Sequence, residues 1–302
     1  MSLADTIGIL GTEKGPLIRE LKAALESLGC RVVLADLKKL SACLPEKSIL
    51  CSDSYGSQIR LEELKGLIVR SLPGGSLEQV LYRANLLHYI EKLGVKVINS
   101  ASAIEKTVDK CYTTSLMAEA GLPVPRTVVT ESFDQAIKAV KDMGSVVVKP
   151  IFGSLGKGIV RIQDLDTAHR VFRALELGRY VYYVQQYMEC GGEDFRLMVA
   201  GGKLIGAMRR RACNGNWKTN IACGATAEEY HPEPEMIRLA LLAAETLKAD
   251  YAGVDILVCE KVPYILEVNG IPGWLGLQSV SQIDIAKTLA EFFLQRIYAN
   301  GL

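Results

Sequence analysis

The chain has 302 residues, of which 49% are hydrophobic and 23% charged, and its formal net charge is +1. This composition is ordinary for a globular enzyme, and the near-neutral charge gives no global field that would recruit nucleic acid or an anionic membrane. No apolar run approaches the ~20 residues that span a bilayer, and no basic segment precedes an apolar stretch at the N-terminus. We therefore expect neither a membrane segment nor a signal peptide.

Short apolar runs alternate with helical patterns through the first hundred residues. Strands are predicted over 6–10, 31–35, 67–70 and 95–98, and helices over 16–28 and 76–93. Alternating strands and helices imply a parallel sheet covered by helices, so the N-terminal part is assigned to the α/β class. The glycines at 8, 11 and 15 do not match G-x-G-x-x-G, and a dinucleotide fingerprint is therefore weak.

A helix is predicted over 104–120 and is closed by Gly121, and the pattern changes after it. Strands are then predicted over 146–149, 158–162 and 180–185, with a helix over 167–177. Beyond residue 195 the chain is typical of antiparallel hairpins, which indicates an α+β arrangement in this half. The hairpin strands are predicted over 197–199, 204–208, 254–258 and 264–269, and helices over 234–247 and 283–298.

Eight cysteines are scattered along the chain and form no C-x-x-C pair. A chain of this size does not need disulfides to stabilise its core, so we expect reduced thiols in a cytoplasmic protein.

Oxygen-bearing side chains come together in the last predicted hairpin. Strand side chains alternate faces, so Glu267 and Asn269 point the same way, and a turn near Lys261 would place Asp255 opposite Glu267. Magnesium prefers such hard oxygen ligands and usually binds substrate phosphates as well. The alternative is a solvated sheet face without a metal.

A lysine, Lys149, ends an apolar strand directly before the glycine-rich loop 153–158. Burying a lysine is unfavourable unless it meets an anion, and the amides of a glycine-rich loop can cradle phosphates. The spacing differs from a Walker A loop, and a simple glycine-rich hairpin turn is the alternative. Three arginines at 209–211 alternate faces without interleaved aromatics, which favours an anionic substrate over nucleic acid.

The order of these motifs resembles that of the ATP-grasp ligases, and most closely the RimK-like group of α-L-glutamate ligases. The matching segments are 109–110, 148–149 with its glycine loop, 184–188, 194–196, 210–212, 218–220, 253–255 and 267–269. The resemblance covers nearly the whole chain and is most specific from Lys110 onward. It implies an ATP-grasp fold with a Rossmann-like domain over 1–100, a central lid over 101–187 and a C-terminal subdomain over 188–302.

The resemblance also implies roles for individual residues. The predicted ATP-binding residues are Lys110, Lys149, Gly153, Ser154, Gly156, Lys157, Gly158, Gln186, Tyr187, Met188, Asp194, Lys218, Thr219 and Asn220. The predicted ligands of magnesium or manganese are Asp255, Glu267 and Asn269, and the predicted catalytic residues are Arg210, Arg211 and Lys149. Two positions depart from the family: Gln186 replaces a glutamate of the adenine hinge, and Gly224-Ala225 replaces paired glycines.

The function that follows is an ATP-dependent ligase that joins a carboxylate to an amine through an acyl phosphate. The resemblance favours L-glutamate as the amine and a small anionic acceptor of the methanopterin type, for which Arg70 and residues 209–211 would supply cations. A ribosomal protein tail, a deazaflavin coenzyme or an amino-group carrier protein are alternative acceptors. A non-catalytic nucleotide-binding regulator and an NAD-dependent enzyme are rival classes. The number of residues added, the α or γ linkage and homo-oligomer formation stay open.

Overall fold

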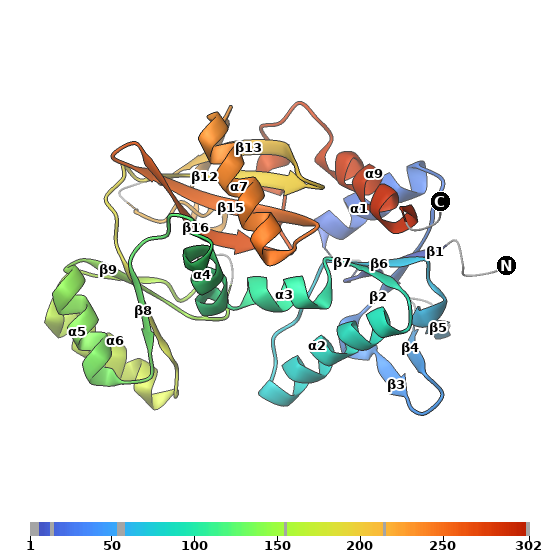
Figure 1. Ribbon diagram of the computed structural model, residues 1–302, viewed down its shortest axis with the longest axis horizontal. Coiled ribbons are helices and arrows are strands. Elements are labelled where there is room, and N and C mark those ends of the chain that lie inside the picture. Colours follow the sequence, from blue (N-terminus) through green and yellow to red (C-terminus); the bar gives the residue numbers. More distant parts are fainter. Residues whose placement is uncertain (1–5, 13–14, 53–57, 154–155, 214–215, 300–302) are drawn as a thin grey trace.

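The computed structural model describes residues 6–12, 15–52, 58–153, 156–213 and 216–299. Figure 1 shows three parts side by side: a sheet built by the N-terminal residues, a central sheet built by the C-terminal residues, and a smaller lid with two helices. Within the described residues, no helix is long and apolar enough to cross a membrane. The domain boundaries expected near residues 100 and 187 stay a prediction.

The N-terminal part contains a four-stranded parallel sheet, which confirms the alternating pattern of strands and helices. Its strand order is β2-β1-β6-β7, formed by β1 (Thr6–Leu10), β2 (Arg31–Ala35), β6 (Gly66–Val69) and β7 (Lys96–Ile98). The helices are α1 (Pro16–Ser27) and α2 (Leu77–Lys92), and the Ser76 hydroxyl accepts a bond from the amide of Gln79 in a capping box at the start of α2.

A small antiparallel sheet lies between β2 and β6 in the sequence and was not predicted. It consists of β3 (Ser41–Cys43), β4 (Ser48–Ser52) and β5 (Gln58–Arg60), flanked by the 3-10 turns η2 (Leu37–Lys39) and η3 (Leu61–Glu63). Strands of three to five residues are too short to show a clear period of two, which explains the omission.

The single helix predicted over 104–120 is wrong, because the structure has two. Helix α3 (Ala101–Val108) ends before Asp109, whose extended backbone (φ −96°, ψ 105°) breaks the helical path. The Asp109 carboxylate then accepts a 3.0 Å bond from the amide of Tyr112 and caps α4 (Lys110–Glu119). An aspartate is a favoured N-cap, and here it begins a new helix with Lys110 in its first turn.

The lid is an antiparallel sheet with one helix-covered face. Its order is β10-β9-β11-β8, formed by β8 (Thr127–Thr130), β9 (Val146–Lys149), β10 (Val160–Ile162) and β11 (Tyr182–Gln186). Val146 and Val148 pack under α5 (Phe133–Met143) and α6 (Leu165–Leu177). Because side chains alternate along a strand, Val147 and Lys149 face the other way.

The C-terminal part is a five-stranded antiparallel sheet that confirms the predicted hairpins. Its order is β14-β13-β12-β15-β16, formed by β12 (Glu193–Ala200), β13 (Lys203–Arg211), β14 (Thr226–Glu229), β15 (Tyr251–Cys259) and β16 (Val262–Asn269). Gly201-Gly202 (φ 56° and 72°) and Glu260-Lys261 (φ 50° and 68°) form the two tight turns. Positive φ at both central residues matches the twist of the flanking strands.

Helices connect the C-terminal sheet to the rest of the molecule. They are α7 (Pro234–Leu247), α8 (Leu275–Gln278), α9 (Ile285–Tyr298) and the 3-10 turn η4 (Ile221–Cys223). Helix α7 packs on the sheet, whereas α9 packs on α1, as Figure 1 shows. One hydrophobic core therefore joins the N-terminal and C-terminal parts of the chain.

A disulfide joins Cys190 to Cys259, which are 69 residues apart in sequence. The expectation of reduced thiols throughout was therefore wrong for this pair. The spacing of the two cysteines does not predict the bond, because they meet only after β12 and β15 pair side by side.

Candidate functional site

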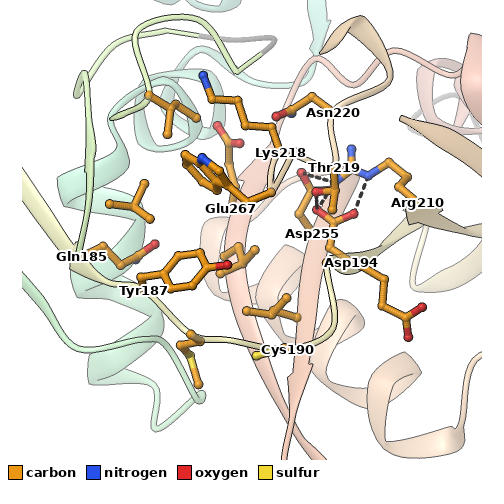
Figure 2. A pocket seen from close by; sticks show the side chains of 18 of the residues that line it. Gln185, Tyr187, Cys190, Asp194, Arg210, Lys218, Thr219, Asn220, Asp255 and Glu267 are labelled. Atoms are coloured by element: carbon orange, nitrogen blue, oxygen red, sulfur yellow. Dashed lines mark hydrogen bonds and ion pairs between the residues drawn. The ribbon is translucent and has the colours of Figure 1, made fainter. Parts of the chain in front are cut away.

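A pocket lies between the lid sheet and the C-terminal sheet (Figure 2). Its lining residues are Val147, Lys149, Ile159, Gln185, Gln186, Tyr187, Met188, Cys190, Gly192, Glu193, Asp194, Arg210, Trp217, Lys218, Thr219, Asn220, Asp255, Leu257, Leu266 and Glu267. Eleven of the predicted site residues therefore come together in this pocket, and they are Lys149, Gln186, Tyr187, Met188, Asp194, Arg210, Lys218, Thr219, Asn220, Asp255 and Glu267.

Lys149 lies at the end of β9 and faces into the pocket, as its strand position predicted. Its ammonium donates a 2.7 Å hydrogen bond to Oε1 of Gln185. Burial lowers the pKa of Lys149 to about 8, and the nearby charge of Lys110 acts in the same direction against the attraction of Glu267. An anion entering the pocket would stabilise the charged form of this lysine.

Gln185 is a pocket residue that the sequence reasoning missed. It is 3% exposed, and its amide nitrogen donates to Oγ1 of Thr127 at 3.0 Å and to the Tyr183 hydroxyl at 3.2 Å. The predicted hinge residue Gln186 instead has an exposed side chain. Gln185 lies opposite Val147, on the same face as Lys149, so the alternation along β11 could have identified it.

The hinge backbone is partly engaged within the lid. The amide of Gln186 donates to the carbonyl of Arg126 at 2.8 Å, and the amide of Tyr187 donates to the carbonyl of Ser145 at 2.9 Å. Of the three residues predicted for the adenine hinge, Gln186 and Tyr187 therefore have backbone N–H groups that are already bonded within the lid.

Two arginines and two aspartates form a buried network at the other end of the pocket. Arg210 donates to both carboxylate oxygens of Asp194 at 2.7 Å and lies 3.1 Å from Asp255, as Figure 2 shows. Arg196 binds Asp255 through two of its nitrogens. Although burial raises the pKa of Asp255, the charges of Arg196 and Arg210 hold it at about 2. Thr219 donates to Asp194 at 2.6 Å, so this aspartate also fixes the loop that follows β13.

The register predicted for the β15–β16 hairpin is confirmed. Asp255 lies opposite Glu267, and Gly253 lies opposite Asn269. The register shifts between Asp255 and Ile256, and this irregularity lets both Leu266 and Glu267 line the pocket.

The oxygen-bearing side chains of this hairpin fit a magnesium ion that is bound partly by the protein and partly by phosphate oxygens. Glu267 is 27% exposed and lies 3.0 Å from the Lys110 ammonium. Asn269 could offer a cation its amide oxygen but not its buried amide nitrogen, which has no partner. No group of three or more His, Cys, Asp and Glu side chains in the described residues could hold a metal. Magnesium is usually held by one or two carboxylates together with substrate phosphates, which this sparse set matches. The roles of Asp255, Glu267 and Asn269 as ligands stay a prediction.

The glycine-rich loop lies at the edge of this site. Lys110 donates a 2.7 Å bond to the carbonyl of Gly153, so one lysine links the loop to Glu267. Gly156 has φ +69°, and a Cβ there would lie 2.5 Å from Oδ1 of Asn220. Gly153, Gly156, Lys157 and Gly158 are not among the lining residues, and Ser154 lies outside the described residues.

The other arginines that the sequence reasoning selected lie outside the pocket. Arg211 and Arg209 occupy the opposite face of β13 from Arg210, where they pair with Glu193 and Glu228. Arg70 donates to the Tyr251 hydroxyl and to the Pro272 carbonyl, each at 2.8 Å, and lies over the Trp274 ring. In this structure Arg209 and Arg211 are thus paired with carboxylates and Arg70 with neighbouring groups of the fold, and the roles expected for these arginines, including a catalytic one for Arg211, stay predictions.

Residues 107–293 match the RimK-like ATP-grasp domain family. The chain is 32% identical to the tetrahydromethanopterin:α-L-glutamate ligase of Methanosarcina acetivorans, over 92% of this chain and 95% of that protein. It is 30% identical to the ligase of the same name from Methanococcus maripaludis, over 94% and 96% of the two chains.

Solved structures share the fold at lower sequence identity. The ATP-grasp ligase PsnB, complexed with a minimal precursor, has a TM-score of 0.76 and 20% identity, covering 97% of this chain and 99% of that chain. The RimK domain protein from Sphaerobacter thermophilus has a TM-score of 0.73 and 22% identity, covering 95% and 98%. The chain belongs to the RimK-like ATP-grasp family and is an ATP-dependent ligase.

Proposed function

We propose that this ligase binds ATP in the pocket between the lid sheet and the C-terminal sheet. The base lies at the hinge near Met188, between the apolar side chains of Ile159 and Leu266, and the phosphates extend toward Lys149 and Lys218. This placement is supported by the distribution of side chains around the pocket, because apolar and hinge residues line one region and charged side chains line another.

The chemistry begins with attack of the acceptor carboxylate on the γ-phosphorus of ATP. The bond from this phosphorus to ADP breaks as the acyl phosphate forms. The amine then attacks the acyl carbon, loses a proton, and phosphate leaves as the amide forms. Phosphoryl transfer depends on positioning and charge neutralisation, so no protein nucleophile is required. Lys149 and Lys218 would supply the charge, while Arg210 holds Asp194 and Asp255 in position.

Glu267 and Asn269 would hold magnesium or manganese, with Asp255 beside them. When bound, the metal supplies positive charge that polarises the phosphoryl oxygens. The ion pair of Glu267 with Lys110 would be exchanged or shared as the ion arrives with the nucleotide. Arg196 and Arg210 keep Asp255 ionised and oriented throughout.

We further propose that the amine is L-glutamate and that the acceptor is a small anionic cofactor precursor of the pterin type. The observation that carries this proposal is the match, over nearly the whole length, to two ligases named for tetrahydromethanopterin and glutamate. A reaction site in the cytoplasm, which the sequence favours, stays part of this proposal. A peptide acceptor is the alternative, because PsnB shares the fold and its structure contains a precursor.

The test offers the purified protein ATP, magnesium and labelled glutamate with one of three acceptors: tetrahydromethanopterin, an acidic-tailed protein, or a precursor peptide. We expect label and the mass of a glutamyl residue on the pterin alone, together with release of ADP. Lys149→Met should abolish the product, whereas Lys203→Met, at the exposed turn after β12, should retain it. Label on the protein or peptide alone would refute the proposed acceptor. Absence of ADP release with every acceptor would support a non-catalytic regulator.

A further inference from the structure

We propose that Trp217 is a positioning residue that couples the nucleobase at the hinge to the loop that contacts the phosphates. This inference rests on the proposed function, because it requires ATP to bind with its base at the hinge. Trp217 lines the pocket directly before Lys218, Thr219 and Asn220, so one short segment reaches from the hinge to the phosphate end. No role was assigned to this tryptophan from the sequence.

On the hinge side, Trp217 meets Tyr187. Their ring centroids are 5.9 Å apart and the planes are at 88°, which is the favourable edge-to-face geometry. Tyr187 is itself fixed, because the Arg161 guanidinium stacks 3.6 Å from its ring centroid and its amide donates to the Ser145 carbonyl. Trp217 therefore contacts a residue that is anchored in the lid sheet.

On the phosphate side, Trp217 is joined to a constrained segment. Oδ1 of Asn216 accepts from the amides of both Trp217 (2.9 Å) and Lys218 (3.2 Å). The hydroxyl of Thr219 then donates to Asp194, which Arg210 holds in place. Bonds from a side chain to the amides that follow it hold the backbone in a turn. Because the backbone of Trp217 and Lys218 is held in this way, a movement of the Trp217 ring also moves Lys218 and Thr219.

The placement of the two contacts gives the coupling a physical basis. A base that packs at Tyr187 and Met188 lies beside the Trp217 ring and limits its rotation. Lys218 follows directly, with its ammonium 5.7 Å from the Trp217 ring centroid, so the same restriction limits where this cation can lie. When a base occupies its position, the side chain of Lys218 has fewer conformations to lose as the phosphates bind. Coupling between two sites is reciprocal, so phosphate binding must raise the affinity for the base by the same factor.

The coupling can be measured with two fragments of ATP, because adenosine and magnesium tripolyphosphate each fill only one part of the pocket. We expect saturating adenosine to tighten tripolyphosphate binding to the wild-type protein about fivefold in calorimetry, near the lower end of common coupling strengths. Trp217→Phe, which retains an aromatic ring, should retain part of this coupling. Trp217→Ala and Tyr187→Leu should each abolish it, and the double variant should lose no more than either alone.

Fluorescence gives a second readout, since the chain has two tryptophans and the other, Trp274, is fully buried. Adenosine alone should change the emission of the wild type but not of Trp217→Phe. Fivefold coupling retained in Trp217→Ala, or absent from a wild-type protein that binds ATP normally, would overturn the inference alone. Failure of the wild type to bind ATP, or ATP binding unaffected by Lys149→Met, would overturn the proposed nucleotide site as well.

Discussion

Raising the pH above about 8 should weaken ATP binding by removing the charge of Lys149. Burial places the pKa of this lysine at about 8, compared with an ordinary value of 10.5. If its ammonium contacts the phosphates, binding of ATP requires the protonated form in the free enzyme. The dissociation constant of ATP should then rise about tenfold for each pH unit above 8. The rise should end where the pH reaches the pKa of Lys149 in the ATP complex, which is higher because the phosphates stabilise the charged form.

The assay is the binding of magnesium ATP to the wild type and to Lys149→Arg between pH 6.5 and 10, measured by calorimetry. An arginine is always charged in this range, so the variant should bind with a flat profile even if it binds more weakly at pH 7. A wild-type profile that is flat to pH 10, or an equal decline in the arginine variant, would show that another group controls nucleotide binding.

The lowered pKa of Lys149 also affects the stability of the fold, which should increase with pH while ATP binding weakens. Because the folded-state pKa lies below the unfolded value, the unfolded chain binds more protons between pH 8 and 10.5, and stability should rise with pH across this window. Below pH 8 the charged lysine, which is partly buried, costs at most about 3 kcal/mol, from the shift of its pKa. Lys149→Met removes this cost but leaves Oε1 of Gln185 without its donor, which costs about 1–2 kcal/mol. We therefore expect the methionine variant to be more stable than the wild type at pH 7 in denaturant unfolding.

Three other perturbations test the site. Glu267→Ala should abolish turnover and raise the magnesium requirement while the unfolding midpoint stays near that of the wild type; near-normal turnover at limiting magnesium would refute its role as a ligand. Gln185→Ala should weaken ATP binding at least tenfold through loss of the Lys149 contact, whereas Gln186→Ala, with its exposed side chain, should change it less than threefold. Reduction of the Cys190–Cys259 disulfide, or Cys259→Ser, should raise the ATP KM about threefold because Cys190 lines the pocket; equal KM values with and without reductant would refute this.

The parts of the site that depend on local rules could be predicted from the sequence. The pairing of Asp255 with Glu267 required only the period of two along a strand and the position of a tight turn. Lys149 was placed correctly because an apolar run ending in a lysine defines both the strand and its end. In the same way, the sequence predicted the bounds of β1 (Thr6–Leu10), β2 (Arg31–Ala35) and α7 (Pro234–Leu247).

The parts that depend on long-range packing could not be predicted in this way. The arginines at 209–211 were all interpreted as cations available to a substrate, but whether an arginine is free depends on acids from other strands. Arg210 is held by Asp194 across the β12–β13 hairpin and by Asp255 from β15, which is two strands away. The Cys190–Cys259 pair has the same origin, since its members come from different strand ends.

The charge balance of the pocket leads us to expect that ATP binds here together with magnesium. Among the lining residues that the structure describes, three cations (Lys149, Arg210 and Lys218) are outnumbered by four carboxylates (Glu193, Asp194, Asp255 and Glu267). Asp194 and Asp255 are balanced by Arg210 and Arg196, and Glu267 pairs with Lys110. Of the described lining residues, Lys149 and Lys218 are therefore the cations left for a triphosphate. Metal-free ATP would bring more negative charge than these two lysines balance, and it would lie close to the Glu267 carboxylate, where charges interact strongly in a partly buried site. We therefore expect chelation of magnesium to weaken ATP binding by about a hundredfold or more, equivalent to about 3 kcal/mol. Glu267→Gln should reduce this dependence, because the variant removes one of the repelling charges. Equal affinity for ATP with and without magnesium would mean that the nucleotide phosphates do not lie against this hairpin.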